Sequence, residues 1–369
     1  MVMTMERRLL LIGPLPPPIT GVSLANNIVH KKIGKIFPIH VSCINMSYPT
    51  FKEDVGRFNY KKAFVYSKRY LELYKISKSD KVYITPGQTF WGILKYAPFI
   101  LYAKLLKKEL IVHIHGDYLW QEYKKLTGVK KEIFKFLFSQ FDKGIVLSKS
   151  LRKNLIPFLP DNKIFELPNF VEDYLFEINL ERKLSQNFSE LRIIYLSNLM
   201  KEKGILDLLE ALLILKERNI HFNAKLAGNI DKGLEKEITK YLKKLEGNVK
   251  YLGVVSGYKK KKLLEWGNIF VFPTYYKMEG QPISILEAYA TGNIVLTTNH
   301  AGIPDIFKEN LNGFYVKKKS PQSLAQVLVK VKRNLEQYKY IAFNNRKEAE
   351  SKYRVSRFLE DFKNILEEQ

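Results

Sequence analysis

Short apolar runs alternate with longer amphipathic segments along the whole chain, and this alternation restricts the possible folds more than any other feature. The apolar runs predict buried strands, and the segments between them carry apolar residues at helical spacing. Strands that alternate with helices favour parallel sheets covered on both faces. The expected strands are 9–12, 82–85, 110–115, 144–147, 192–196, 223–227, 249–251, 269–272 and 294–297, and the expected helices include 91–106, 130–141, 205–218, 235–245, 283–290 and 324–335.

The alternation breaks once, near Pro168 and Asn169 and the polar stretch 179–190, which has the composition of a linker. A chain of 369 residues is long enough for two domains of ordinary size. We therefore expect an α/β protein with two Rossmann-like, doubly wound domains over 1–175 and 190–350. Such sheets bind ligands outside the carboxyl ends of their strands. Two of them that face each other form a cleft, where we expect the chemistry.

Composition limits the setting of the protein. Cys43 is the single cysteine, which excludes an internal disulfide framework and indicates a reducing compartment. The apolar run 9–12 is too short for the core of a signal peptide, and the sequence has no apolar stretch that could span a membrane. We expect a cytoplasmic protein, either soluble or peripheral on a membrane.

The formal charge of +24 lies unevenly along the chain. Residues 1–170 contain 28 Lys and Arg residues against 12 Asp and Glu residues. This half of the chain should be attracted to an anionic partner, either nucleic acid or an acidic membrane surface. High lysine usage in the genome is the alternative explanation.

Several motifs of nucleotide and metal chemistry are missing from the sequence. The dinucleotide fingerprint G-x-G-x-x-G does not follow the first strand, and neither a P-loop, H-E-x-x-H, a cysteine cluster nor D-x-D occurs. We therefore expect no metal and no bound cofactor. Any phosphate must be neutralised by Lys or Arg side chains, backbone N–H groups and helix N-termini.

The stretch from Glu279 to Glu287, EGQPISILE, is the strongest local signal. It follows the expected strand 269–272, and Pro282 suits the first turn of a helix because it lacks an N–H group. The N–H groups of Gln281, Ile283 and Ser284 at this helix start can bind an anion. One carboxylate can face a sugar ring while the other accepts hydrogen bonds from ribose hydroxyls.

Glu279 and Glu287, with seven residues between them, resemble the E-x7-E signature of retaining GT-B glycosyltransferases. The stretch VFPTYYKMEGQPISILEAYATGNIVLTTNHAGIPDIF resembles the corresponding segment of glycosyltransferase family four, the group 1 family of bacterial polysaccharide synthesis. YLSNLMKEKGILDLLEAL, LAGN, VKYLGVVSG, IVHIHGDY, VLSKSLRKNL, LPNFVE and GPLPPPITGVSLA match further segments in the same order. The resemblance covers nearly the whole chain. It implies a GT-B fold, with acceptor binding by the first domain and donor binding by the second.

The resemblance also implies roles for residues of the second domain. Glu279 would hold hydroxyls of the donor sugar, and Glu287 would hold the ribose. Lys203, in KEKG, would pair with the diphosphate as it becomes the leaving group. Asn198 stands where many members carry an arginine, so one of two usual phosphate cations is replaced by a neutral donor. Gln281, Pro282 and Ile283 complete the expected donor site.

In the first domain, His113 and His115 alternate on one strand and so face the same side. By resemblance, His115, nearest the carboxyl end, would contact the donor sugar and help to position the acceptor, although either histidine could simply be a buried core residue. Gly21 would let the backbone approach the diphosphate. The last helix, about 353–369, would pack back onto the first domain. The family's same-face attack implies retention of anomeric configuration.

The expected function is transfer of a sugar from a nucleotide-sugar to a saccharide or lipid-linked acceptor in cell-surface polysaccharide synthesis. Lysines and aromatic residues in 61–81 and around 91–131 suit an anionic membrane surface on the cytoplasmic side. The apolar stretch 91–106 itself could instead be an ordinary core helix, so the charged segments are the better membrane candidates. Two alternatives remain: a GT-B sugar-nucleotide epimerase, and a basic nucleic-acid-binding protein. Against the second, the sequence contains no recognised nucleic-acid module.

Overall fold

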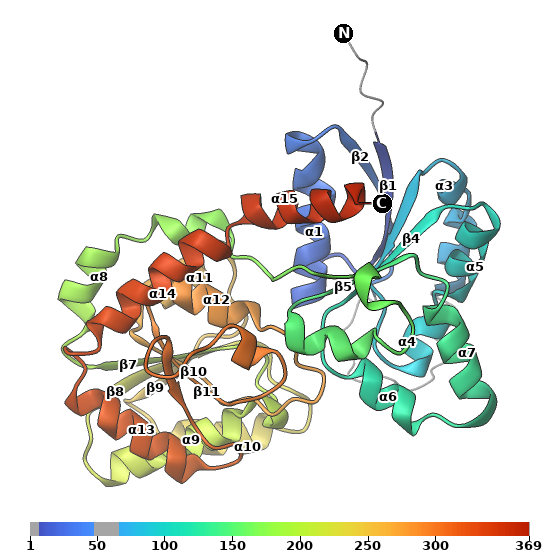
Figure 1. Cartoon of the computed structure of the whole chain (residues 1–369). Helices are drawn as coiled ribbons and strands as arrows, with labels where there is room; N and C mark the ends of the chain where they lie inside the picture. Colours follow the sequence, from blue (N-terminus) through green and yellow to red (C-terminus); the bar gives the residue numbers. More distant parts are fainter. Residues whose placement is uncertain (1–6, 48–65, 369) are drawn as a thin grey trace. The chain divides into compact units, whose positions relative to one another are not determined.

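The computed structural model describes residues 7–47 and 66–368, and its course is traced in Figure 1. Part of the lysine-rich stretch 61–81 therefore lies outside the described residues. The density of contacts divides the chain into two compact units. Unit 1 comprises Met1–Pro168, Met278–Gln281 and Phe358–Gln369, and unit 2 comprises Asn169–Lys277 and Pro282–Arg357. The predicted α/β class is confirmed, because each unit contains one six-stranded parallel sheet.

The sheet of unit 1 has the strand order β2-β1-β3-β4-β5-β6, and every neighbouring pair is parallel. Its centre is almost wholly apolar, as expected of strands covered on both faces. The chain order reverses on either side of β1, so the carboxyl ends of β1 and β3 lie next to each other. The strands are β1 (Arg7–Gly13), β2 (Ile39–Asn45), β3 (Lys81–Ile84), β4 (Glu109–Ile114), β5 (Lys143–Val146) and β6 (Ile164–Glu166).

Helices connect these strands and cover the sheet (Figure 1). The α-helices are α1 (Gly21–Ile36), α3 (Tyr74–Ser77), α4 (Phe90–Leu94), α5 (Ala97–Leu105), α6 (Leu119–Lys125), α7 (Gly128–Phe138) and α15 (Val355–Glu367), and the 3-10 turns are η1 (Lys68–Glu72), η2 (Lys149–Asn154) and η3 (Asp161–Lys163). Among the described residues, none of the helices combines the length and the apolar character that crossing a bilayer requires.

The sheet of unit 2 has the order β12-β11-β10-β7-β8-β9, again parallel throughout. Its strands are β7 (Leu191–Leu196), β8 (Phe222–Ala227), β9 (Val249–Tyr251), β10 (Ile269–Phe272), β11 (Ile294–Thr297) and β12 (Gly313–Tyr315). The helical segments are η4 (Asp173–Glu177), α8 (Leu180–Asn187), η5 (Lys201–Lys203), α9 (Ile205–Glu217), α10 (Glu235–Lys244), α11 (Gly257–Trp266), α12 (Ile283–Ala290), η6 (Ile303–Asp305), α13 (Pro321–Arg333) and α14 (Lys339–Lys352).

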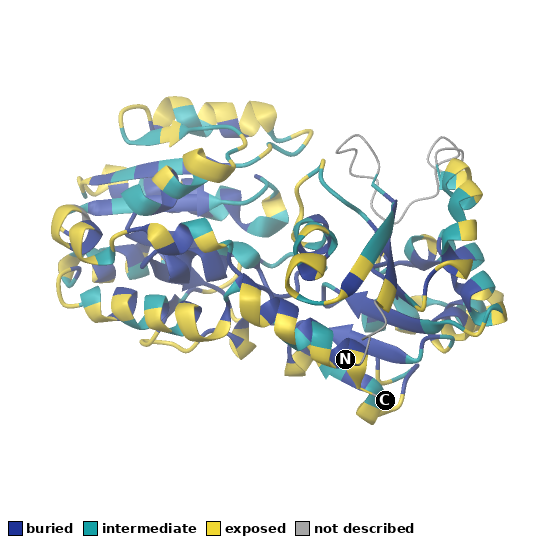
Figure 2. Cartoon of the chain, turned by 90° about the horizontal axis from the view of Figure 1, so that it is seen from above, coloured by how far each residue is buried: buried dark blue, intermediate teal, exposed yellow. Residues whose placement is uncertain are grey.

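Burial follows the layers of each unit, with dark-blue strands inside and exposed residues on the outer faces of the helices (Figure 2). In unit 2, all residues of β10 and β11 are buried, and in unit 1 the same holds for β5. Each fully buried aliphatic or aromatic side chain contributes about 1.5–3 kcal/mol through removal of apolar surface from water. These strands therefore fix the position of the loops that follow them.

The expected helix 91–106 is two helices in the structure, α4 and α5. Pro98 lies in the first turn of α5 and cannot donate a backbone hydrogen bond, so a continuous helix would lose one bond and clash with the preceding turn. Strands β2, β6 and β12 were not predicted from the sequence. β6 and β12 have three residues each, and β2 mixes polar and apolar residues.

The stretch expected as a linker is packed onto unit 2 instead. Leu184 and Phe188 belong to its hydrophobic core. The ammonium group of Lys183 is buried and donates hydrogen bonds to the carbonyls of Leu264 (2.8 Å) and Thr291 (2.6 Å) and to Oδ1 of Asn293 (3.0 Å). A lysine can be buried when all of its donors find acceptors. The units therefore divide after Pro168, earlier than the expected boundary.

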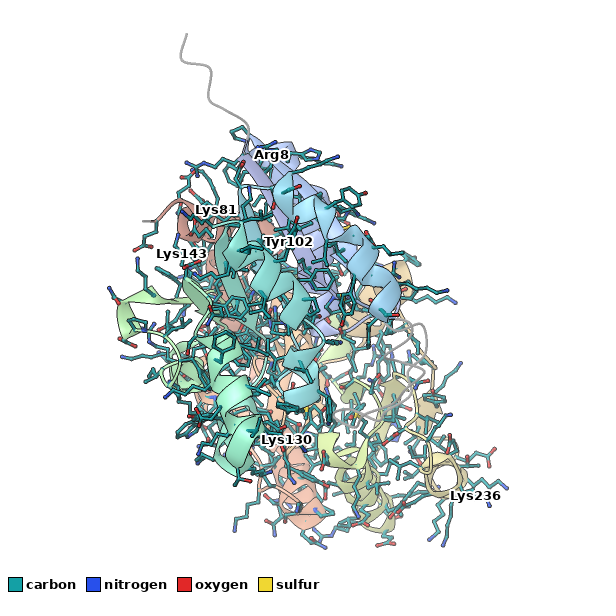
Figure 3. The ribbon with its side chains drawn as sticks, turned by 90° about the vertical axis from the view of Figure 1, so that its right-hand side faces the viewer. Arg8, Lys81, Tyr102, Lys130, Lys143 and Lys236 are labelled. Atoms are coloured by element: carbon teal, nitrogen blue, oxygen red, sulfur yellow. The ribbon has the colours of Figure 1, made fainter. Side chains whose placement is uncertain are left out.

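The end of α15 is tied to the amino ends of the strands of unit 1. Lys143 donates to the carbonyl of Ile365 (3.0 Å), and Lys81 donates to that of Leu366 (2.6 Å). Both lysines also pair with Glu109, with 2.8 Å between Lys143 Nζ and the carboxylate. Figure 3 shows Lys81 and Lys143 close together at this edge. Cations at a helix C-terminus satisfy its unpaired carbonyls and its dipole.

Candidate active site

The carboxyl end of β4 brings two histidines together in unit 1. The ring centroids of His113 and His115 lie 3.8 Å apart, as expected of alternate residues on one side of a strand. The phenolic oxygen of Tyr83 lies 2.7 Å from Nδ1 of His113. Both ring nitrogens of His115 are buried and have no hydrogen-bond partner among the described residues. A buried polar group without a hydrogen bond destabilises the folded protein, and a ligand that supplies the missing bond reduces this cost.

Burial keeps both histidines neutral. It lowers the pKa of His115 to about 3, and it lowers that of His113 well below the ordinary value, with a further contribution from His115. A neutral imidazole can donate from one nitrogen and accept at the other. His115 can therefore bind a hydroxyl in either direction, which suits a sugar.

The loop residues Met278–Gln281 belong to unit 1 and lie against the segment that follows β4. A Cβ atom on Gly280 would lie 2.5 Å from the carbonyl oxygen of His115, and one on Gly116 would lie 2.5 Å from that of Met278. Glycine at both positions thus permits this approach of two backbones. The side chain of Gln281 donates to the carbonyl of Leu147 at 3.2 Å. Glu279 is buried and directly precedes Gly280 in the sequence. These contacts therefore hold Glu279 close to the backbone of His115.

Gly21 is the first residue of α1, in the loop that follows β1. Thr20 and Ser23 form a capping box, in which the Thr20 hydroxyl accepts from the Ser23 N–H (3.1 Å) and the Ser23 hydroxyl accepts from the Thr20 N–H (2.8 Å). The loop also depends on Asn26, which sequence analysis missed. Its side-chain amide donates to the Pro14 carbonyl (2.9 Å) and to the Thr85 hydroxyl (2.8 Å), and so joins the loops after β1 and β3.

In unit 2, Asn198 and Lys203 lie in the loop that follows β7. The Tyr195 hydroxyl donates to the carbonyls of Asn198 (3.1 Å) and Lys203 (3.3 Å), which holds the two ends of this loop. Gly204 ends the η5 turn with φ +79°, and a Cβ atom there would lie 2.4 Å from the Pro273 carbonyl oxygen. These contacts therefore hold the loop in one conformation.

The Lys203 ammonium lies 5.6 Å from the ring centroid of Phe272 and 5.4 Å from that of Tyr276. Phe272 ends β10, and Tyr276 follows it in the loop toward α12. Because β7 and β10 are neighbouring parallel strands, these two loops leave the same edge of the sheet. Lys203 thus stands at the carboxyl end of the sheet, where ligands of such folds bind.

The same loop after β10 leads to Pro282, which caps α12, and to Ile283, the first residue of that helix. Pro282 is thus the N-cap residue immediately before the expected helix 283–290, rather than a residue of its first turn. Glu287 lies on the second turn and is buried. Its Oε1 is 2.5 Å from Nζ of Lys260, which is also 3.1 Å from Oε2 of Glu172. Neither partner lies near Glu287 along the chain, so the sequence did not predict either of them.

The expected site residues are thus divided between the units. Unit 1 groups His113, His115, Glu279 and Gln281 around the carboxyl end of β4, and Gly21 follows its strand β1. In unit 2, Asn198 and Lys203 lie in the loop after β7, Pro282 ends the loop after β10, and Ile283 and Glu287 lie on α12, which follows that loop. Within residues 7–47 and 66–368, His, Cys, Asp and Glu side chains form no group of three or more that could hold a metal ion.

Two parallel doubly wound sheets with loops of this kind define the GT-B class of fold, in agreement with solved structures. The Anabaena protein HepE, in complex with UDP, superimposes with a TM-score of 0.71 at 16% identity, over 98% of this chain and 99% of that one. The family model "Glycosyl transferases group 1" matches residues 177–348. The resemblance to the group 1 family is thereby confirmed for that segment, which contains the expected donor residues of unit 2.

Two curated relatives support the same family. An uncharacterized glycosyltransferase of Methanocaldococcus jannaschii is 31% identical over 221 residues, which are 57% of this chain and 55% of that protein. The amylovoran biosynthesis glycosyltransferase AmsK of Erwinia amylovora is 27% identical over 235 residues, which are 62% of this chain and 56% of AmsK. The matched region thus spans little more than half the length of these relatives.

Proposed function

We propose that this protein is a retaining glycosyltransferase that moves a sugar from a nucleotide-sugar to a saccharide or lipid-linked acceptor in cell-surface polysaccharide synthesis. The observation that carries the proposal is the placement of Lys203 in the loop after β7 and of Glu287 on α12, the helix that follows the neighbouring strand β10, within the segment that matches the group 1 family. The name of AmsK, which refers to amylovoran biosynthesis, supports the polysaccharide pathway.

In the proposed reaction, the acceptor hydroxyl oxygen forms a bond to the anomeric carbon, and the bond from that carbon to the phosphate oxygen breaks. The hydroxyl proton passes to the departing phosphate on the same face of the sugar, so the anomeric configuration is retained. Lys203 stabilises the negative charge that develops on the diphosphate, an effect of about 3 kcal/mol for a well-placed donor. Asn198 adds a neutral donor beside it.

The remaining expected residues bind and orient the substrates. Glu279 accepts hydrogen bonds from the donor sugar, neutral His115 binds a further sugar hydroxyl, and Glu287 accepts from the ribose. The N–H groups at the start of α12, including that of Ile283, receive part of the phosphate charge. Gly21 offers the diphosphate an approach free of a side chain. We propose that the reaction needs neither a metal nor a cofactor, so activity should persist in excess chelator.

Incubation of the purified protein with a panel of sugar nucleotides and lipid-linked saccharides tests this function directly. Transfer of sugar to the acceptor, with the anomeric configuration read by NMR, is the expected result. Release of an epimerised sugar nucleotide without an acceptor would instead identify an epimerase. A salt-sensitive gel shift with duplex or single-stranded probes, without sugar transfer, would identify a nucleic-acid-binding protein.

We also propose that unit 1 docks on the anionic cytoplasmic face of a membrane, where lipid-linked acceptors are presented. The helices α5 and α7, with the turn that follows α5, form what we call the lysine-rich face, which Figure 3 shows from the front. It exposes Leu101, Leu105, Val129 and Phe136 together with Lys107, Lys130 and Lys135. Exposed apolar side chains among lysines suit the interface between lipid headgroups and acyl chains. Each lysine near such a surface contributes about 1 kcal/mol of attraction.

A further inference from the structure

The carboxylate of Glu287 lies at one end of a row of three charged side chains in unit 2. Lys260 Nζ stands between Oε1 of Glu287 (2.5 Å) and Oε2 of Glu172 (3.1 Å). The Glu287 side chain is 5% exposed and that of Lys260 is 12% exposed, while Glu172 reaches the surface at 28%. The row joins α11, α12 and the segment just before η4. These three elements are far apart in the sequence.

The acidic and basic groups of this row are unequal in number. Two carboxyl groups face one lysine, so a single cation is shared between two acids. An uncompensated charge in a buried position is costly unless hydrogen-bond donors surround it. Lys260 occupies Oε1 of Glu287, and Oε2 remains as the oxygen that can accept hydroxyl donors from a ligand. A vicinal diol provides two such donors.

We propose that Lys260 is a positioning residue, which keeps Glu287 ionised and turned toward the ribose diol of the donor, and that Glu172 fixes Lys260 in turn. This inference rests on the proposed function, in which Glu287 binds the ribose. It adds that recognition of the diol depends on a cation that does not touch the substrate. Without Lys260, both burial and the neighbouring Glu172 would disfavour ionisation of the Glu287 carboxyl group.

The groups that face Glu287 determine the direction in which loss of Lys260 changes the pKa of Glu287. Burial raises the pKa of the Glu287 carboxyl group, Lys260 opposes that rise, and Glu172 adds to it. Burial lowers the pKa of Lys260, but Glu287 and Glu172 outweigh burial and hold it above the ordinary value. The Tyr174 ring lies 5.7 Å from Lys260 Nζ, and burial raises the pKa of its phenol to about 12, so it stays neutral. Loss of Lys260 should therefore raise the pKa of Glu287 further.

The experiment compares the binding of UDP and 2′,3′-dideoxy-UDP by calorimetry, with the full chain and three variants. GDP and ADP with their dideoxy forms replace UDP if wild type does not bind it. Lys260→Met removes the cation, and Lys260→Arg restores it. Lys262→Met is the matched control, because Lys262 lies on the same helix, is 55% exposed and pairs with Glu265 at 3.2 Å. Thermal unfolding of each variant checks the fold.

Wild type should prefer the ribonucleotide by roughly tenfold or more, the range expected of hydrogen bonds to a charged acceptor. Lys260→Met should lose most of this preference without weaker binding of the dideoxy form, Lys260→Arg should regain part of it, and Lys262→Met should match wild type. Binding of UDP to Lys260→Met should also strengthen as pH rises through the raised pKa of Glu287, whereas binding to wild type should not. If Lys260→Met fails to fold, a reduced preference in the milder Glu172→Gln variant supports the inference, and an unchanged preference refutes it.

A folded Lys260→Met variant that keeps the wild-type preference would overturn the inference. Equal loss of affinity for both ligands would also overturn it, because Lys260 would then support only the fold. If wild type binds the two ligands equally well, Glu287 does not bind the ribose. The inference then fails, while sugar transfer can still be observed. A wild type that binds none of the three nucleoside diphosphates contradicts the proposed function itself.

Discussion

The Tyr83 hydroxyl lies 2.7 Å from Nδ1 of His113, on the neighbouring strand and in the core of unit 1. Phe362 of α15 packs edge-on against the same tyrosine, with ring centroids 4.9 Å apart. On its other side, the ring of His113 contacts that of His115 at a tilt of 31°. A contact at the C-terminal helix is thus linked, through two buried rings, to a residue of the candidate active site.

Replacement of Tyr83 by phenylalanine should lower the free energy of unfolding by about 1–2 kcal/mol, because it leaves Nδ1 of His113 buried without its partner. Urea unfolding monitored by circular dichroism measures the change. Tyr102→Phe is the control, since Tyr102 is only partly buried and its loss should cost almost nothing. Equal stability of the Tyr83 and Tyr102 variants would contradict the structural importance of the bond.

Acid should destabilise unit 1 through its two buried histidines. Burial depresses their pKa values in the folded protein, whereas in the unfolded chain they titrate near 6.5. Below that pH the unfolded chain binds protons that the folded chain does not. The stabilisation is therefore complete above about pH 6.5 and is lost as pH falls toward about 3 for His115.

Urea unfolding between pH 7.5 and 4.5 tests this dependence. Each histidine should contribute a slope of up to about 1.4 kcal/mol per pH unit over this window. The His115→Gln variant should show a shallower slope than wild type. An unchanged slope in that variant would mean that other groups cause the loss of stability in acid.

Lys203→Ala should reduce kcat on the order of 100-fold, because it removes a donor to the charge that develops on the leaving diphosphate. The free energy of unfolding should change little, since Lys203 lies in a partly exposed turn. Lys201→Ala is the matched control, as Lys201 lies in the same η5 turn and is exposed. A similar kcat in the two variants would remove Lys203 from the mechanism.

Glu279→Gln should also lower kcat strongly, because the amide keeps the shape of the side chain but loses the charge that binds the sugar hydroxyls. Glutamine is preferred to alanine here, since Glu279 is buried and truncation would leave a cavity. Initial rates at saturating donor, with the melting temperature measured in parallel, provide the test. Wild-type turnover in this variant would exclude a role for the carboxylate.

The lysine-rich face should bind vesicles that contain anionic lipid and release them as salt rises, because such attraction is screened within about 8 Å at physiological ionic strength. The double variant Lys107→Glu/Lys130→Glu should bind more weakly in a sedimentation assay and bind UDP as wild type does. Lys236→Glu/Lys240→Glu makes the same charge change on α10 of unit 2 and should leave vesicle binding nearly unchanged. Equal binding to neutral and anionic vesicles would refute docking by charge.

The sequence alone predicted the alternation of strands and helices, and several elements agree to the residue, including β10, β11 and α12. These elements are continuous apolar runs bounded by turn residues, so local composition predicts that they are buried. The stretch EGQPISILE was found for the same reason, since its residues follow one strand and begin one helix. Pro98 marks the break between α4 and α5 in the sequence, within the range that was expected to be one helix, 91–106.

Only the tertiary structure decided which distant side chains meet. Lys260 lies in a run of four lysines, and nothing in that run distinguishes the one that pairs with Glu287 from the other three. Lys183 stands in a polar stretch that has the composition of a linker, yet it is buried against three acceptors of unit 2. The physical reason is that local pattern determines which face of an element is apolar, whereas the partner of a buried charge depends on how several elements pack.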